Sequence, residues 1–102
     1  MELEVIRWNE NAKPREATLR QRLEADGFEV FRWRDDAAAD YQPHAHDHDE
    51  SLWILQGEIT FGIGDERHRL GPGDRLMLPK GTIHTALAGA EGCLYFIGQR
   101  PA

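Results

Sequence analysis

Four of the five histidines of this chain lie in two short segments that are rich in potential metal ligands. The first segment, residues 44–50, reads His-Ala-His-Asp-His-Asp-Glu, and the second, residues 73–84, ends at His84. Neutral imidazoles together with a carboxylate are the ligands that a divalent transition metal takes from a protein. The two segments are far apart in the sequence and each is bordered by turn residues, so together they predict a single metal site.

The spacing of the first segment limits how one ion can be bound. Residues two apart in a β-strand share a face and lie about 6.6 Å apart, so His44 and His46 can converge on one ion. In a straight strand His44 and Glu50 would lie about 20 Å apart, which no single ion can span. We therefore expect the chain to turn around residues 47–49 and to return Glu50 on a neighbouring strand beside His46.

The two segments resemble the two sequence motifs of the cupin superfamily. The matching positions are His44, His46, Glu50 and Gly57 for the first motif, and Gly73, Pro79, Gly81 and His84 for the second. Ala88 stands where the second motif has an asparagine, which is not a metal ligand in the family. The resemblance covers residues 30–98. It implies an all-β fold, a double-stranded β-helix or jelly-roll barrel, with one divalent transition metal per chain.

On this resemblance and spacing we assign His44, His46, Glu50 and His84 as the metal ligands. His48 is expected at the turn, at the mouth of the site, and the alternative is that His48 replaces Glu50 as a ligand. Manganese, iron, cobalt, nickel, copper and zinc all accept such ligands, so the ligand set does not choose the metal. We favour iron or manganese, with nickel, zinc, cobalt or copper as alternatives, and no other cofactor is indicated.

Three nitrogens and one carboxylate would leave two positions of an octahedral ion open for water, O₂ or a chelating ligand, as is typical of a catalytic metal. The resemblance implies an oxygenase, isomerase or decarboxylase acting on a small oxygenated molecule. His48 and Tyr41 are candidate acid or base groups, although no constellation of residues identifies a reaction. The alternative is a non-catalytic module that binds or senses a small molecule through the metal, so the sequence does not decide whether the chain is an enzyme.

The expected elements are one short helix followed by strands. Pro14 suits a first helical position and Gly27 a stop, and between them Leu19 and Leu23 share one face of an amphipathic helix. Alternating residues in 3–8 predict an edge strand. After Gly27, short apolar segments separated by Gly and Pro turns favour a sandwich or barrel. The expected strands cover residues 28–33, 51–56, 59–63 and 76–78, with a last pair at 82–88 and 93–97 around residues 89–92.

Length and charge restrict the classes of function. A chain of 102 residues has room for a single domain, with residues 1–29 as an N-terminal extension and 30–98 as the barrel. The net charge of −6, with no Lys/Arg run, argues against binding nucleic acid or anionic membranes. Without a signal-like start or an internal cysteine pair, we expect a cytoplasmic protein. The resemblance and the N-terminal edge strand predict a homodimer whose ligand is a small molecule.

Several other reactive or aromatic residues are expected to have structural roles. Cys93 is predicted to be a small strand hydrophobe, and His68 an exposed strand residue. Arg75 could point into the barrel toward a substrate carboxylate or lie at the surface. Parity does not decide between pocket and core for the aromatic residues Tyr41, Phe61 and Tyr95. Core or interface anchors are expected at Trp8, Trp33 and Trp53.

Overall fold

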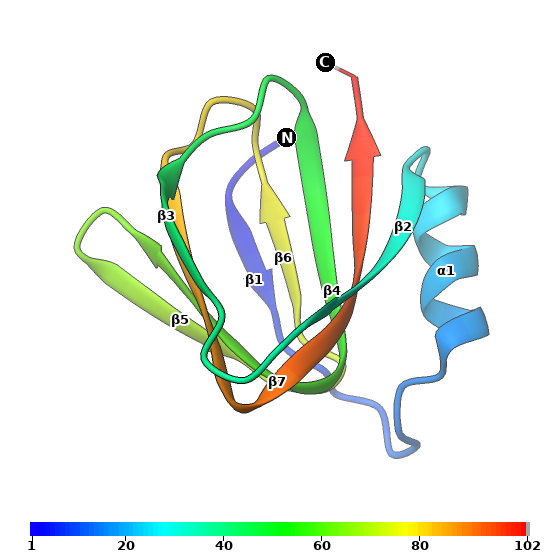
Figure 1. Cartoon of the computed structure of the whole chain (residues 1–102). Helices are drawn as coiled ribbons and strands as arrows, with labels where there is room; N and C mark the ends of the chain where they lie inside the picture. The colour runs from blue at the N-terminus through cyan, green and yellow to red at the C-terminus, as the bar shows by residue number, and fades with distance from the viewer. Residues whose placement is uncertain (102) are drawn as a thin grey trace.

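The computed structural model describes residues 1–101 as a bent β-sheet with one helix packed against it (Figure 1). All-β architecture with a short N-terminal helix is therefore confirmed. The elements in chain order are β1 (Glu4–Ile6), α1 (Glu16–Ala25), β2 (Glu29–Asp35), β3 (Asp40–His44), β4 (Asp49–Ile63), β5 (Glu66–Leu70), β6 (Arg75–Leu78) and β7 (His84–Arg100). No helix in this described range is long and apolar enough to span a bilayer.

The long strands β4 and β7 organise the sheet. They pair antiparallel, with Asp49 opposite Arg100 at one end and Gly62 opposite Thr85 at the other. On its other edge β4 pairs first with β6 and then with β5, whereas β7 pairs first with β3 and then with β2. β1 pairs with β6 at the end of the sheet, as expected of an edge strand. Both long strands bend sharply, so the sheet folds into two facing layers and is not closed among the described strands (Figure 1).

The bend depends on two glycines with left-handed backbone conformations. Gly57 of β4 has φ +79° and Gly92 of β7 has φ +78°, values that residues with a Cβ rarely adopt. The two backbones also cross closely, because a Cβ on Gly57 would lie only 2.2 Å from the carbonyl oxygen of Gly92. Glycine is thus required at residue 57 both by conformation and by space.

This bend corrects the expected pairing at the end of the chain. Residues 82–88 and 93–97 do not form a hairpin around residues 89–92, because both segments belong to the single strand β7 and both pair with β4. Residues 51–56 and 59–63 are likewise two halves of β4. The turn-forming residues therefore mark the corner where a strand passes from one layer to the other, and not a reversal between neighbouring strands.

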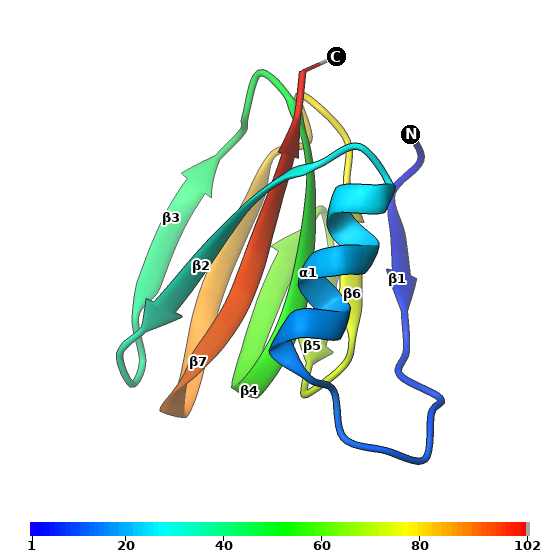
Figure 2. The same cartoon turned by 90° about the vertical axis from the view of Figure 1, so that its right-hand side faces the viewer.

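Two apolar clusters stabilise the fold. One fills the space between the layers and includes Ile54, Phe61 and Tyr95. The other lies between the outer face of the sheet and α1, which Figure 2 shows lying against that face. Leu19 and Leu23 are fully buried there, so the predicted helical face is confirmed. The helix begins at Glu16 rather than at Pro14, and Gly27 follows its end with φ +90°.

Arg75 belongs to the helix side of the sheet and not to the interior between the layers. Its Nε donates to Oγ of Ser51 at 2.7 Å and its Nη2 to Oδ2 of Asp26 at 3.0 Å. The guanidinium lies 4.4 Å from the centroid of the buried Trp53 ring. Both of the roles considered from the sequence, a substrate contact and a surface position, are therefore wrong for Arg75, because it is buried and fully engaged in packing.

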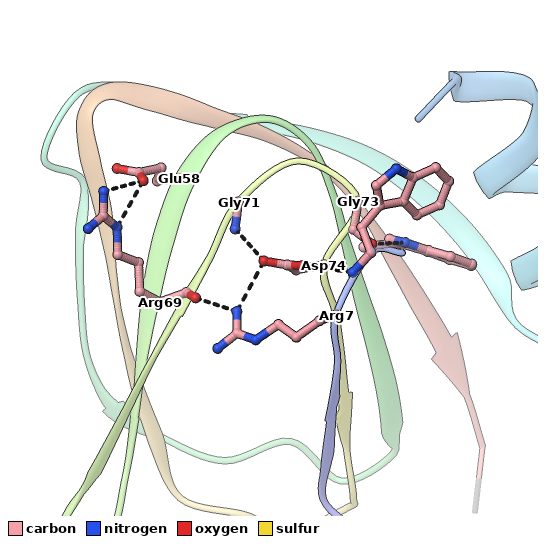
Figure 3. A network of polar contacts seen from close by, with 8 residues as sticks. Arg7, Glu58, Arg69, Gly71, Gly73 and Asp74 are labelled. Atoms are coloured by element: carbon pink, nitrogen blue, oxygen red, sulfur yellow. Dashed lines mark hydrogen bonds and ion pairs between the residues drawn. The ribbon is translucent and has the colours of Figure 1, made fainter. Parts of the chain in front are cut away.

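The N-terminal segment is held to the body of the protein by Asp74 (Figure 3). One carboxylate oxygen accepts from the backbone N–H of Trp8 at 3.0 Å, and the other accepts from Gly71 N–H and from Arg7 Nη1, each at 3.0 Å. The Trp8 ring covers Gly73, where a Cβ would lie 2.2 Å from it. The turn at residues 71–74 therefore fixes the position of β1.

We expect Asp74→Ala to lower the free energy of unfolding by about 2 kcal/mol, because it removes a carboxylate that accepts several hydrogen bonds. Urea unfolding followed by circular dichroism measures this change. Glu10→Ala is the matched control: it breaks an exposed 2.7 Å ion pair with Arg22 and should leave stability unchanged. Equal stability of the two variants would show that Asp74 does not anchor the segment.

Candidate metal centre

The first segment turns as its spacing requires. β3 ends at His44, His46 lies in the following loop, and Glu50 is the second residue of β4. His46 Nε2 lies 3.6 Å from Glu50 Oε1, so the predicted return of Glu50 beside His46 is confirmed. The strand that carries Glu50, β4, is nevertheless not hydrogen-bonded to β3 as expected. β3 pairs with β7, whereas β4 pairs with β5, β6 and β7.

The second segment holds the first in place. In the turn at residues 79–81, the Gly81 N–H donates to the carbonyl oxygen of His46 at 2.9 Å, and the Lys80 N–H donates to Oδ1 of Asp49 at 2.9 Å. His84 then opens β7 directly opposite His44. The turn thus brings the two histidine-bearing segments together.

Three imidazoles meet at this point. The ring centroids of His44 and His84 are 4.3 Å apart, those of His44 and His46 5.0 Å, and those of His46 and His84 5.2 Å. A nitrogen from each ring lies within 4.8 Å of a nitrogen from each of the others. Nδ1 of His44 lies 2.7 Å from the Gln42 carbonyl oxygen and Nδ1 of His84 lies 2.9 Å from that of Thr82. Because a carbonyl only accepts, Nδ1 of His44 and of His84 carries the proton, which leaves Nε2 as the free metal-binding atom.

Glu50 lies beside this cluster and is buried. Its Oε2 is 2.8 Å from His48 Nε2 and 3.4 Å from Gln99 Nε2. His46, His48 and Glu50 also bring their ligand atoms within 4.8 Å of one another, so His46 is shared by two potential ligand groups. The donor set suits a divalent transition metal. Which of His48 and Glu50 completes it stays a prediction.

The surroundings of the histidines shift their pKa values in opposite directions. Burial lowers the pKa of His84 and of His46, which favours the neutral, metal-binding form of both rings. The hydrogen bond with Glu50 instead raises the pKa of His48. His48, half-buried at the mouth, therefore holds a proton more readily than the rings of the cluster.

A cavity of about 240 Å³ lies against the cluster, between the two layers of the sheet. Its polar end is formed by the histidines, Glu50 and Gln99. Its other walls are mostly apolar or aromatic and consist of Trp33, Tyr41, Leu52, Phe61, Ala86, Tyr95 and Ile97. Tyr41, Phe61 and Tyr95 thus all face the cavity, which parity alone did not decide.

A buried carboxylate links three aromatic side chains of this wall. Asp35 accepts hydrogen bonds from the Trp33 Nε1–H at 2.9 Å and from the Tyr95 hydroxyl at 2.7 Å, and also from the Tyr41 hydroxyl. Burial raises the pKa of Tyr41, and the hydrogen bond to Asp35 adds to this effect. Tyr41 therefore faces the cavity as a protonated hydroxyl.

The sequence analysis did not identify Asp35 or Gln99 as site residues, and it assigned Trp33 a structural role. The available signal was strand parity, since Trp33 and Asp35 share one face of β2, and Gln99 shares a face of β7 with Tyr95. Parity becomes informative only once one residue of a face is known to line the site.

Two other predictions concern residues outside the cavity. Cys93 is buried in the core between the layers, and burial raises its pKa to about 12, so the predicted role as a small hydrophobe is confirmed. His68 is half-buried rather than exposed, because on β5 it lies opposite Phe61, a core residue of β4. Its Nε2 is 3.3 Å from Oε1 of Glu66.

Comparison with solved structures finds related folds. KdgF from Halomonas sp. is 30% identical, with a TM-score of 0.65 over 72% of this chain and 68% of that chain. The DMSP lyase DddQ from Ruegeria pomeroyi DSS-3 is 29% identical with a TM-score of 0.65, and the match covers 70% of this chain but only 36% of the lyase. DSY2733 from Desulfitobacterium hafniense DCB-2, at 16% identity, matches 96% of this chain and 77% of its own with a TM-score of 0.63, which shows the fold alone.

No curated protein matches the chain significantly. The model of one family, described as the cupin domain, matches residues 31–96. This range contains both histidine-bearing segments and most of the sheet, and it agrees with the resemblance at residues 30–98. The protein therefore belongs to the cupin family.

Proposed function

We propose that this protein binds one divalent transition metal through Nε2 of His44, His46 and His84 and the carboxylate of Glu50, and that it acts as a metalloenzyme on a small oxygenated molecule. The observation that carries this proposal is the meeting of three imidazoles and a buried carboxylate at the polar end of a cavity. Iron or manganese is the favoured metal, with nickel, zinc, cobalt and copper as alternatives.

A divalent metal held there would polarise a substrate oxygen and stabilise negative charge that develops on it. The Tyr41 hydroxyl faces the same cavity, and its single O–H would have to turn from Asp35 toward a bound molecule to donate to it or protonate it. At the mouth, the Nε2–H of His48 donates to the Glu50 carboxylate at 2.8 Å. Of the oxygenase, isomerase and decarboxylase reactions, the similarity to the DMSP lyase DddQ favours the decarboxylase type, because it cleaves a bond without oxidation.

The first test is elemental analysis of the protein as purified, followed by titration of the metal-free protein with Mn²⁺, Fe²⁺, Ni²⁺ and Zn²⁺ under anaerobic conditions. One equivalent per chain is expected. Binding of no metal, or of several equivalents with equal weak affinity, would contradict the proposed site.

The alternative function is a non-catalytic module that binds or senses a small molecule through the metal. The metal-loaded protein should be screened with small hydroxy acids, keto acids and enediols, with both turnover and binding recorded. Turnover supports the enzyme, and Tyr41→Phe should then slow it at unchanged metal content. Tight binding without turnover supports the sensing module.

We expect the metal to remain bound at pH 6 and to be lost as the pH falls to about 5 or below, because protons compete with the metal for neutral imidazoles. Burial lowers the pKa of His84 and of His46, so both rings take up a proton only at a lower pH and keep the metal bound further into the acid range. Dialysis at stepped pH with metal analysis measures the loss. Full occupancy after dialysis at pH 4 would rule out imidazole ligands.

We also propose that the chain forms a homodimer through its N-terminal segment. Met1, Leu3 and Ile6 lie in or beside β1, and each exposes at least 40% of its surface. Together they form an exposed apolar group at the end of the sheet. Analytical ultracentrifugation should show a dimer at micromolar concentration, and Leu3→Glu with Ile6→Glu should shift it to monomer. A monomeric native chain would exclude this assembly.

A further inference from the structure

The aromatic wall of the cavity contains an exposed side chain that is held in one orientation. Trp33 exposes 48% of its surface, and an indole so exposed would ordinarily sample several rotamers. Its Nε1–H donates to Oδ1 of Asp35 at 2.9 Å and lies 3.3 Å from the Tyr41 hydroxyl oxygen. Asp35 is itself only 5% exposed and fixed by Tyr95. Trp33 is therefore a preorganised flat surface that faces the cavity.

The charge of the cavity is equally restricted. Within residues 1–101 no lysine or arginine lines it, the one carboxylate among its lining residues is Glu50, and the carboxylate of Asp35 lies directly behind the aromatic wall. The adjoining hollow at the mouth is lined by Glu29, Asp47 and His48 among others, and both ring nitrogens of His48 are already engaged by the carboxylates of Asp47 and Glu50. The hollow therefore offers acidic groups and no unpaired cation among its lining residues. A divalent ion bound with one carboxylate leaves a single net positive charge. One negative charge on a ligand can be neutralised there, and a second would have no partner.

The size of the cavity sets a further limit. At about 240 Å³ it lies below the range of about 300–1,000 Å³ that is typical of sites for drug-sized ligands. A single ring or a conjugated chain of similar size, together with a chelating group, would fill it.

We infer, on the basis of the proposed metal site, that the ligand is a small flat molecule that chelates through two adjacent oxygens, carries at most one negative charge, and places an apolar conjugated body against Trp33. This class includes enolised diketones, hydroxyketones and aromatic hydroxy acids. Phosphorylated and dicarboxylate metabolites are excluded, because their second charge would be buried without a cation.

The test uses the protein loaded with Ni²⁺ and three probes that share one chelating group: acetohydroxamate, benzohydroxamate and 4-carboxybenzohydroxamate. Isothermal titration calorimetry gives their affinities. Benzohydroxamate should bind about tenfold more tightly than acetohydroxamate, since aromatic contacts and burial of the ring favour it. The additional carboxylate should cost about tenfold, because no cation faces it.

Variants of one strand identify the contact. Trp33→Ala should abolish the preference for the phenyl group while acetohydroxamate affinity and nickel content stay unchanged, and Trp33→Phe should keep part of it. Phe31→Ala is the matched control: Phe31 lies two residues away on the same face of β2 and exposes 42% of its surface, but it does not line the cavity.

Equal affinity of the native protein for acetohydroxamate and benzohydroxamate, or an undiminished preference in Trp33→Ala, would contradict the inference that an apolar part of the ligand packs against Trp33. Equal affinity for benzohydroxamate and 4-carboxybenzohydroxamate would contradict the limit of one negative charge. Failure of the native protein to bind Ni²⁺ would instead overturn the proposed function and this inference with it.

Discussion

His84→Ala is expected to lose most of the bound metal although His44, His46 and Glu50 remain. His84 is buried and its Nδ1–H is fixed by the Thr82 carbonyl, so its Nε2 is held in one orientation. Loss of a group that merely orients a ligand costs about 10- to 100-fold in metal affinity. Loss of the ligand itself should therefore cost at least about 100-fold, measured by titration with a competing chelator.

The controls for His84→Ala separate ligands from neighbours. His48→Ala should retain nearly normal metal content but alter ligand binding or activity, and His68→Ala should change neither. Glu50→Gln preserves the shape of the side chain and should weaken metal binding if Glu50 is a ligand. Equal metal loss from His48→Ala and His84→Ala, with little from Glu50→Gln, would mean that His48 is the ligand in place of Glu50.

Gly57→Ala is expected to destabilise the fold by about 3 kcal/mol. Two independent costs combine at this position. The left-handed φ of +79° strains any residue with a Cβ, and that Cβ would lie 2.2 Å from the Gly92 carbonyl oxygen, which is backbone and cannot rotate away. Relief of this contact requires the two central strands to separate at their bend. Chemical denaturation of the metal-free protein measures the loss without a contribution from metal binding.

Two other glycines serve as graded controls for this prediction. Gly64→Ala introduces a Cβ at φ +59° with no atom within 4 Å, so only the conformational cost of about 1 kcal/mol remains. Gly71 has no left-handed conformation and open space around it, so Gly71→Ala should be nearly neutral. If Gly57→Ala were no more destabilising than Gly64→Ala, the close approach of the strands would contribute nothing.

The correct sequence predictions rested on short-range geometry. The spacing of His44, His46 and Glu50 allowed one ion only if the chain turned between them, and the structure has that turn. Leu19 and Leu23, four residues apart, necessarily share a helical face, and both are buried. In each case a local repeat limits where side chains can point, whatever the rest of the chain does.

The tertiary structure alone decided the features that depend on distant segments. Strand parity shows that Trp33 and Asp35 share a face, but the pairing of β2 with β7 decides that this face lines the cavity. The same reason applies to Arg75, whose side of the sheet is covered by the helix. Glycine turns predict a change of direction, yet whether residues 89–92 end a strand or bend it depends on β4, which pairs with both halves. Such outcomes depend on contacts between residues remote in sequence, which local patterns do not encode.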